Sequence, residues 1–330
     1  MRAAYIEELG PAEVIRYGEI AAPRPGPTDV LVDVLATTVN PVDTFVRSGR
    51  FPTQVDFPFV VGRDLVGMVA EAGPGVSGFR AGDRVWCNSL GHGGRQGAAA
   101  EQAVVAADRL YHLPAGVDPD AAVAAFHPAA TAYLALFVHG RLRVGESVLI
   151  AGAAGNVGSA LVTMAARAGA RVLATAGARD APYCAELGAA EVFDYRDPEV
   201  TGRIRRAAPS GIDLYLDTAG VNDLETTVGL LARRGRVVLL AGARTRPVLP
   251  AGELYLHDRS IVGFVISHAT PDELAEAAAY LNDLLGRGAL HPRGIEVFPL
   301  SATADVHARM EKGELHGRRV VLRTDLGCAG

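Results

Sequence analysis

The chain has 330 residues, which is enough for two domains with cores of their own. Hydrophobic residues make up 49% of it and charged residues 21%, as is usual for a folded globular protein. The net charge is −5 and no basic run stands out, so neither a nucleic acid nor an anionic membrane is expected as a partner.

The first 120 residues predict an irregular β-rich domain. Short runs of β-forming residues at 29–35, 67–71 and 83–86 are separated by turn signals rich in glycine and proline. Short strands interrupted in this way are typical of a small barrel. The sequence therefore predicts a sheet-based domain at the start of the chain.

From about residue 121 the pattern changes to alternating helices and strands. A helical stretch at 119–138 precedes a strand at 148–151. Further strands are expected at 171–175, 191–194, 213–217, 236–241 and 260–266, with helices between them at 157–169, 181–187, 198–207 and 222–233. This alternation predicts a doubly wound α/β domain with a parallel sheet and right-handed crossovers.

The last part of the chain is expected to return to the first domain. A helix is predicted at 271–286 and a strand at 319–323. The β-rich domain is therefore expected to comprise 1–121 and 267–330, and the nucleotide-binding domain 122–266.

A glycine motif follows the strand at 148–151. Gly152, Gly155 and Gly158 are spaced three apart, and an apolar helical pattern begins directly after them. Glycines at this spacing let the backbone turn sharply, approach a pyrophosphate and pack a helix on a strand, while the helix N-terminus attracts phosphate. A tight turn without a ligand is the alternative. The backbone contacts to a dinucleotide are expected from Gly152, Ala154, Gly155, Asn156, Val157 and Gly158.

The end of the second strand of this domain favours NADPH over NADH. NAD-specific folds usually carry an acidic residue there to hold the ribose 2′-hydroxyl, but the first acid here is Asp180, beyond the expected position. Arg179 is the leading partner for a 2′-phosphate, because a guanidinium binds that group with charge-assisted hydrogen bonds. The alternative is that Arg179 is a solvated loop residue.

The cysteines point to a reducing compartment. Cys87, Cys184 and Cys328 form neither a disulfide framework nor a CxxC pair. No window approaches twenty uninterrupted apolar residues, and the N-terminus lacks the core of a signal peptide. We therefore expect a cytoplasmic protein.

Several motifs together resemble one enzyme superfamily. They are the segment 40–49, Gly82-Asp83-Arg84-Val85, Thr131-Ala132-Tyr133, the glycine motif, Glu186-Leu187-Gly188-Ala189 and Asp217-Thr218-Ala219-Gly220. In these segments the chain resembles the medium-chain dehydrogenase/reductase superfamily, and within it the zinc-free quinone oxidoreductase branch that includes zeta-crystallin. The resemblance runs over nearly the whole chain. It implies a GroES-like catalytic domain, a Rossmann nucleotide-binding domain, NADPH as cofactor and a small-molecule substrate.

The resemblance also bears on metal. Zinc-dependent relatives place a cysteine and a Gly-His-Glu sequence where this chain has Asn40 and Gly62-Arg63-Asp64. Zinc needs three or four converging ligands, and no such set stands in register here. The four histidines at positions 92, 112, 127 and 139 would form a set of zinc ligands only if the fold brought them close together. We expect a metal-free enzyme, in which hydride goes to an acceptor whose negative charge spreads by conjugation.

Three residues are expected near the reacting groups. The resemblance places the Asn40 amide beside the nicotinamide and the substrate carbonyl, although an Asn-Pro pair also forms turns. It places the Thr131 hydroxyl near the nicotinamide ring, with a helix hydroxyl bonded to its own backbone as the alternative. Phe45 stands where the branch usually has a tyrosine.

The resemblance implies further cofactor contacts. A strand containing Phe264 and Val265 would hold the carboxamide through its backbone amides, although an ordinary buried strand has the same pattern. Tyr195 and Arg318 are expected near the 2′-phosphate. Ala219 and Gly242, in the loops after two later strands of the nucleotide domain, complete the expected set.

Phe45 bears on the acceptor, because it has no proton to give. Reducing a carbon–carbon double bond needs a proton on the carbon beside the one that takes the hydride, so a placed acid speeds the step. A hydroquinone can take its protons from water or from the ribose hydroxyls of the cofactor. The sequence therefore favours a quinone. An enone or enoyl-thioester reductase, with the proton from Tyr133 or His127, and a non-catalytic NADPH-binding protein are the alternatives.

The apolar side chains around this position leave two interpretations open. Either they line a pocket for a flat acceptor, or they belong to the core. The side chains concerned are Phe45, Phe51, Phe59, Trp86, Leu90 and Phe264.

The apolar run at 260–266 would form an edge strand that a partner subunit covers, so a homodimer is expected.

Overall fold

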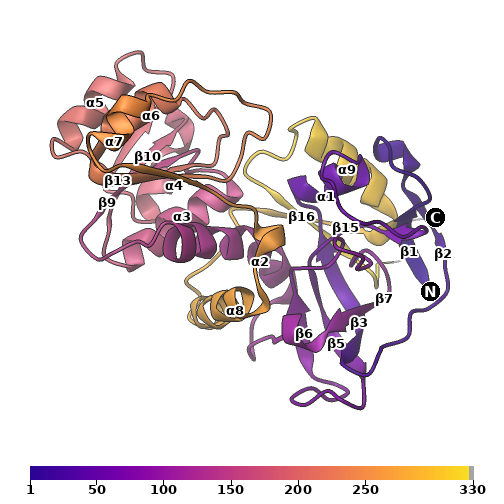
Figure 1. The fold of residues 1–330 in the computed structure, drawn as a ribbon. Helices are drawn as coiled ribbons and strands as arrows, with labels where there is room; N and C mark the ends of the chain where they lie inside the picture. The colour runs from indigo at the N-terminus through magenta and orange to yellow at the C-terminus, as the bar shows by residue number, and fades with distance from the viewer. Residues whose placement is uncertain (327–330) are drawn as a thin grey trace. The chain divides into compact units, whose positions relative to one another are not determined.

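The computed structural model describes residues 1–326, and these form two compact units (Figure 1). Unit 1 comprises Met1–His127 and the chain from Thr270 onward, and unit 2 comprises Pro128–Ala269. The sequence placed these divisions at 121/122 and 266/267. The first of them lies inside helix α2 (Pro119–Tyr133), at Pro128, and the helix continues through that proline. Cys328 lies outside the described residues.

Unit 1 is built on two sheets. The larger has the order β15-β16-β3-β5-β6-β8, and β7 also pairs with β3. Its strands are β15 (Ile295–Pro299), β16 (Arg319–Arg323), β3 (Asp29–Thr38), β5 (Leu65–Ala72), β6 (Arg84–Cys87), β8 (Tyr111–His112) and β7 (Gln102–Ala106). The smaller has the order β2-β1-β4, formed by β2 (Arg16–Glu19), β1 (Arg2–Ile6) and β4 (Phe59–Val60). The β-rich first domain is confirmed.

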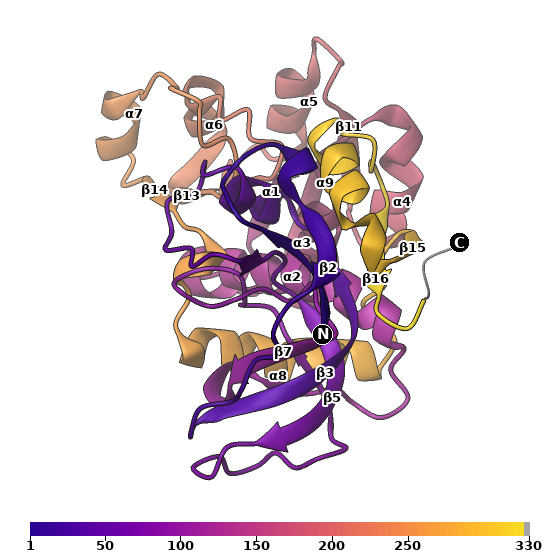
Figure 2. The same cartoon turned by 90° about the vertical axis from the view of Figure 1, so that its right-hand side faces the viewer.

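The C-terminal segment completes the larger sheet. Strand β16 runs antiparallel to β3 and parallel to β15, so the end of the chain joins strands from its first hundred residues (Figure 2). The helices of this unit outside α2 are α1 (Pro41–Arg47), α8 (Pro271–Gly286) and α9 (Thr303–Glu311). The expected helix at 271–286 and strand at 319–323 are confirmed at the same bounds.

The structure of unit 1 shows which of the apolar side chains with two possible roles, pocket or core, are buried. Phe59, Trp86 and Leu90 are buried, and the Trp86 ring stacks on Phe126 with centroids 3.6 Å apart. The Trp86 indole N–H is also used, since it donates to Asn282 at 3.1 Å. These three are therefore core residues, whereas Phe45 is exposed at the surface.

Unit 2 is a doubly wound domain, as the sequence predicted. Its six strands are all parallel in the order β11-β10-β9-β12-β13-β14. The strands are β9 (Ser147–Ala151), β10 (Arg171–Ala176), β11 (Glu191–Asp194), β12 (Ile212–Asp217), β13 (Leu231–Leu239) and β14 (Ser260–Gly263). The helices after α2 are α3 (Asn156–Arg167), α4 (Ala181–Glu186), α5 (Val200–Ala207), α6 (Leu224–Leu230) and α7 (Ala251–Tyr255). Because the strand order reverses beside β9, the loops after β9 and β12 flank the position where such folds bind dinucleotides.

Two predicted elements of unit 2 have different bounds. The helix expected to reach 233 ends at Leu230, and β13 begins at the next residue. Leu230 and Leu231 are both buried in the same apolar cluster, so the apolar pattern runs on through the change of structure. Strand β14 stops at Gly263 rather than 266, because Ile266–His268 form a 3-10 turn.

Among residues 1–326, one helical stretch is long and apolar enough to cross a membrane. It is Pro119–His139, which comprises α2 and a π-helical turn at Leu134–His139, and 78% of its most apolar window is buried within the protein. Burial of this degree is what the core helix of a folded domain shows.

Candidate active site

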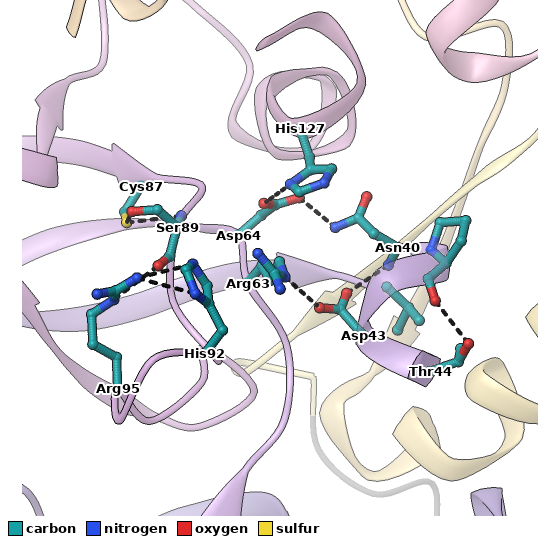
Figure 3. Close-up of polar contacts among 12 residues, drawn as sticks. Asn40, Asp43, Thr44, Arg63, Asp64, Cys87, Ser89, His92, Arg95 and His127 are labelled. Atoms are coloured by element: carbon teal, nitrogen blue, oxygen red, sulfur yellow. Dashed lines mark hydrogen bonds and ion pairs between the residues drawn. The ribbon is translucent and has the colours of Figure 1, made fainter. Parts of the chain in front are cut away.

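Asn40 lies at the centre of a buried polar network in unit 1 (Figure 3). Its backbone is extended, as the following Pro41 requires, and its N–H donates to the Asp43 carboxylate at 2.7 Å to begin α1. The side-chain Nδ2 donates to Asp64 Oδ2 at 2.8 Å, and Oδ1 accepts from Arg319 at 2.9 Å. The orientation of the amide is therefore fixed at both ends.

The network continues on the far side of Asp64. The other carboxylate oxygen of Asp64 lies 3.3 Å from Nδ1 of His127, on α2. Arg319 also donates to the Ala124 carbonyl at 2.8 Å and to the Thr38 hydroxyl at 3.1 Å. These contacts join α1, α2, β3 and β16 around one set of polar groups.

A second ion pair borders the network. The buried Arg63 lies 3.7 Å from Asp43, and its Nη2 has no hydrogen-bond partner in the described chain. Burial raises the pKa of Asp43 from 3.8 to about 6, against the opposing charge of Arg63. The Asp43 carboxylate is therefore ionised at neutral pH but costs the fold free energy.

His92 and Arg95 lie on the glycine-rich segment between β6 and β7 (Figure 3). Burial, helped by Arg63, Arg95 and Arg109, lowers the pKa of His92 to about 3. The ring is therefore neutral and accepts a hydrogen bond from Arg95 at 2.9 Å.

Phe45 is on α1, a few residues from Asn40. Its side chain is 38% exposed, and the Arg50 guanidinium lies 4.9 Å from the ring centroid. Arg50 and the buried Arg47 both pair with Glu311, at 2.8 and 2.7 Å. The Phe45 ring therefore offers an apolar surface that a fixed cation partly covers.

In unit 2, the loop after β9 has the geometry that the glycine motif predicts. Gly152 has φ +75, and a Cβ there would meet the Thr218 hydroxyl at 2.6 Å. A Cβ on Gly158 would lie 2.2 Å from the Gly152 carbonyl, so α3 packs too closely for any other residue. Gly155 precedes the first turn of α3. Its N–H and that of Ala153 already donate to the carbonyls of Gly152 and Thr175, so the first amides of α3 are the ones available for a phosphate.

The turn after β12 is held by one carboxylate. Buried Asp217 accepts from the amides of Ala219 and Gly220 at 2.8 Å each and from Asn222 at 2.7 Å. The expected cofactor residue Ala219 thus has its N–H committed. Gly242, with φ +77, sits against the Gly220 carbonyl, where a Cβ would come within 2.4 Å.

Charged and aromatic side chains gather at the end of β10. Arg179 is 76% exposed, and its Nε lies 3.7 Å from Asp180. The Arg196 guanidinium lies 4.8 Å from the ring of Tyr195 and 3.7 Å from the position that a Cβ on Gly177 would take. Arg196 was missed in the sequence, although its place directly after Tyr195 was a signal.

The other expected residues are placed as follows. Arg318 belongs to unit 1, where it pairs with Glu296. Thr131 is buried on α2 within unit 2. The Phe264 amide donates to the Leu239 carbonyl at 3.2 Å and its ring stacks on His139, while Val265 follows beyond the end of β14.

Two of the four histidines, His92 and His127, lie close enough to interact electrostatically, and the other two have surroundings of their own. His112 bonds to the Gly78 carbonyl, and His139 stacks on Phe264 in the other unit. Within residues 1–326, no group of three or more His, Cys, Asp and Glu side chains is arranged to hold a metal ion.

Comparison with known proteins identifies the family. Residues 26–115 match the model described as alcohol dehydrogenase GroES-like domain, and residues 156–283 the model described as zinc-binding dehydrogenase. The quinone oxidoreductase of Rattus norvegicus is 33% identical over 310 residues, which cover 93% of each chain. The chain belongs to the quinone oxidoreductase family of the medium-chain dehydrogenases/reductases. The expected superfamily, branch and fold are confirmed, and the protein is an oxidoreductase.

Two further relatives bear on function. A mycobacterial protein solved in complex with NADPH has a TM-score of 0.84 and 28% identity, with 98% of this chain and 100% of that chain covered. The human synaptic vesicle membrane protein VAT-1 homolog is 29% identical over 318 residues, which cover 90% of this chain and 80% of the other. The family thus includes proteins that are not named as enzymes.

The raised pKa of Asp43 predicts a pH-dependent stability. Because the folded state binds the Asp43 proton more tightly than the unfolded state, the free energy of unfolding should fall as pH rises from about 4 to about 6. A shift of about two units corresponds to roughly 3 kcal/mol. Denaturant unfolding between pH 4 and 7 should show this decline in the parent protein and its loss in Asp43→Asn. Asp33→Asn, at an exposed position on β3, is the control, and an undiminished decline in Asp43→Asn contradicts the assignment.

Proposed function

We propose that this protein is an NADPH-dependent, zinc-free reductase that transfers hydride to a conjugated carbonyl acceptor, with quinones preferred. The network around Asn40 carries the proposal. Asn40, Arg63 and Asp64 stand at the positions of the zinc ligands in zinc-dependent relatives. Asn40 is hydrogen-bonded to Asp64 and to Arg319, and Arg63 lies 3.7 Å from Asp43. A buried guanidinium at such a position repels a cation, so the acceptor must stabilise its own negative charge by conjugation.

The NADPH part of the proposal is supported by unit 2. The loop at Gly152–Gly158 fits a pyrophosphate, because close backbone contacts require its glycines and the first amides of α3 have no intrahelical partner. Arg179, Tyr195 and Arg196 fit a 2′-phosphate at the end of β10. The mycobacterial relative with bound NADPH gives the same cofactor. When bound, NADPH supplies the hydride.

The residues of unit 1 are assigned to the acceptor. Asn40 donates one N–H to Asp64 and has a second, which we assign to the acceptor carbonyl. Phe45 supplies an apolar face for a flat ring. The loss of the family's tyrosine hydroxyl at this position favours quinones over enones.

We also propose that the protein is a homodimer formed through unit 2. Strand β14 is the edge of the sheet, and exposed apolar side chains lie on the segment that leads into it and in the loop after β12. They are Val221, Val248, Leu249, Tyr255 and Leu256. A second copy would cover both the open strand edge and this apolar surface.

The acceptor preference is tested by a panel of quinones, enones and enoyl thioesters with NADPH. The parent protein should reduce quinones fastest, and Phe45→Tyr should raise the rate with enones by about tenfold, more than with quinones, because it restores a proton donor. Phe51→Tyr is the control for adding a hydroxyl to a nearby ring. Faster reduction of enones or enoyl thioesters by the parent protein supports the enoyl-reductase alternative, and no turnover of any acceptor supports the non-catalytic one.

If the enzyme is zinc-free, as we propose, it should keep full activity in the presence of a chelator. The purified protein should contain no stoichiometric zinc by elemental analysis, and dialysis against EDTA should leave kcat unchanged. One tightly bound zinc per chain, lost together with activity, contradicts the proposal.

Cofactor selectivity is tested at the end of β10. Arg179→Ala and Arg196→Ala should each raise the KM for NADPH by roughly tenfold, since a hydrogen bond to a charged group contributes about 1.5–3 kcal/mol. The KM for NADH should stay unchanged, because NADH has no 2′-phosphate. Arg203→Ala, on α5, is the matched control. An equal rise in the KM for NADPH and in the KM for NADH would show that the substituted arginine does not contact the 2′-phosphate.

The oligomeric state is tested by sedimentation velocity at micromolar concentration. The parent protein should sediment at twice the 34.4 kDa of one chain. Tyr255→Glu should give the monomer, because it places a charge in the apolar surface. A monomeric parent protein refutes the dimer.

A further inference from the structure

Three charged side chains meet where α1 and α9 lie side by side (Figure 1). Arg47, at the end of α1, and Arg50, shortly after it, both donate through Nη2 to the same carboxylate oxygen of Glu311 on α9, at 2.7 and 2.8 Å. A guanidinium is always charged, so two cations share one anion here. One positive charge of this cluster is therefore not balanced within it.

Burial decides which of the two arginines can meet a ligand. The Arg47 side chain is fully buried, and its Nε donates to the Gly10 carbonyl at 3.1 Å. The Arg50 side chain is 41% exposed. Its Nε donates to the Ser48 hydroxyl at 2.9 Å and its Nη2 to Glu311, and neither contact uses Nη1. Arg50 therefore has N–H groups left for a ligand, on a side chain that solvent reaches.

The Arg50 guanidinium also lies against the Phe45 ring. Its central carbon is 4.9 Å from the ring centroid, within the range of a cation–π contact. Phe45 is still 38% exposed, so the ring keeps apolar surface that the guanidinium does not cover. Because Ser48 and Glu311 hold the guanidinium in place, the surface of unit 1 here combines an open aromatic ring with a fixed cation.

A flat acceptor with an acidic substituent matches both parts of this surface. A quinone ring packs on an exposed aromatic ring because both lose apolar area to water-free contact. A carboxylate or sulfonate on the quinone would accept charge-assisted hydrogen bonds from the planar guanidinium. A neutral quinone would use the apolar part alone.

We propose that Arg50 determines the class of acceptor, and that this class is a quinone with an anionic substituent on its ring. The inference rests on the function proposed above, in which Phe45 supplies a face of the acceptor site. Arg50 binds the substituent rather than the reacting carbonyl, which is assigned to Asn40. Its contribution therefore belongs to the KM for the acceptor and not to kcat.

The test compares two quinones of nearly the same shape, a naphthoquinone sulfonate and the corresponding neutral sulfonamide. The parent protein should have the lower KM for the sulfonate. Arg50→Gln should raise that KM by about fivefold, a modest factor because an ion pair at a half-exposed guanidinium is weaker than a buried one. The KM for the sulfonamide and both kcat values should stay within twofold. Arg16→Gln, which removes an exposed arginine of β2 that pairs with Glu7, is the matched control.

Salt dependence and direct binding give two further readouts. Because salt screens exposed charges, the KM of the parent protein for the sulfonate should rise with ionic strength, whereas its KM for the sulfonamide should not. Arg50→Gln should lose this salt dependence. Calorimetric titration with the sulfonate in the absence of NADPH should show the same weakening in Arg50→Gln, and it requires no turnover.

The outcomes separate this inference from the proposed function. An unchanged KM for the sulfonate in Arg50→Gln, or an equal change for sulfonate and sulfonamide, overturns the role of Arg50 even where the parent protein reduces quinones. A weaker Kd for NADPH with an unchanged KM for the sulfonate assigns the arginine to a cofactor phosphate and also overturns it. If the parent protein reduces no acceptor, the proposed function fails, and the calorimetric comparison still decides whether Arg50 binds the anionic ring.

Discussion

The structure of unit 1 depends on the burial of paired charges around Asn40. Asp43, Asp64, Arg63 and Arg319 are all buried, and a buried charge is tolerated only when a partner and hydrogen bonds replace water. Removing one member of such a pair costs about 3–5 kcal/mol, because the other is left uncompensated. The network thus ties the C-terminal strand β16 to α1 and α2, which are distant from it in sequence.

The same pairing prepares the site for chemistry. Asn40 is bound at both ends of its amide, so the N–H that we assign to the acceptor is held in place before the acceptor arrives. A fixed donor avoids the free-energy cost of reorientation during the reaction. The network therefore joins distant segments of the chain and also fixes the amide that we propose binds the acceptor.

Unit 2 prepares its site by backbone geometry instead. Gly152 and Gly158 have no room for a Cβ, so the loop after β9 can approach a ligand closely. Side-chain charge matters only further along, at the end of β10, where Arg179 and Arg196 lie near the acidic Asp180. The pyrophosphate and the 2′-phosphate would thus be recognised by different means, amides for the first and guanidinium groups for the second.

The sequence by itself determined the two-domain architecture and the nucleotide loop. Hydrophobic periodicity and glycine spacing are local properties, so the strands at 191–194 and 319–323 and the glycines of the motif could be assigned without tertiary contacts. The tertiary structure alone decided where β13 begins, because an apolar run continues unchanged from α6 into the strand. It also decided the polar partners of Asn40. Arg319 stands 279 residues away and Asp64 24 residues away, and no local pattern indicates which buried charges meet. Phe59, Trp86 and Leu90 were assigned to the core for the same reason, since burial depends on what packs against a side chain rather than on its type.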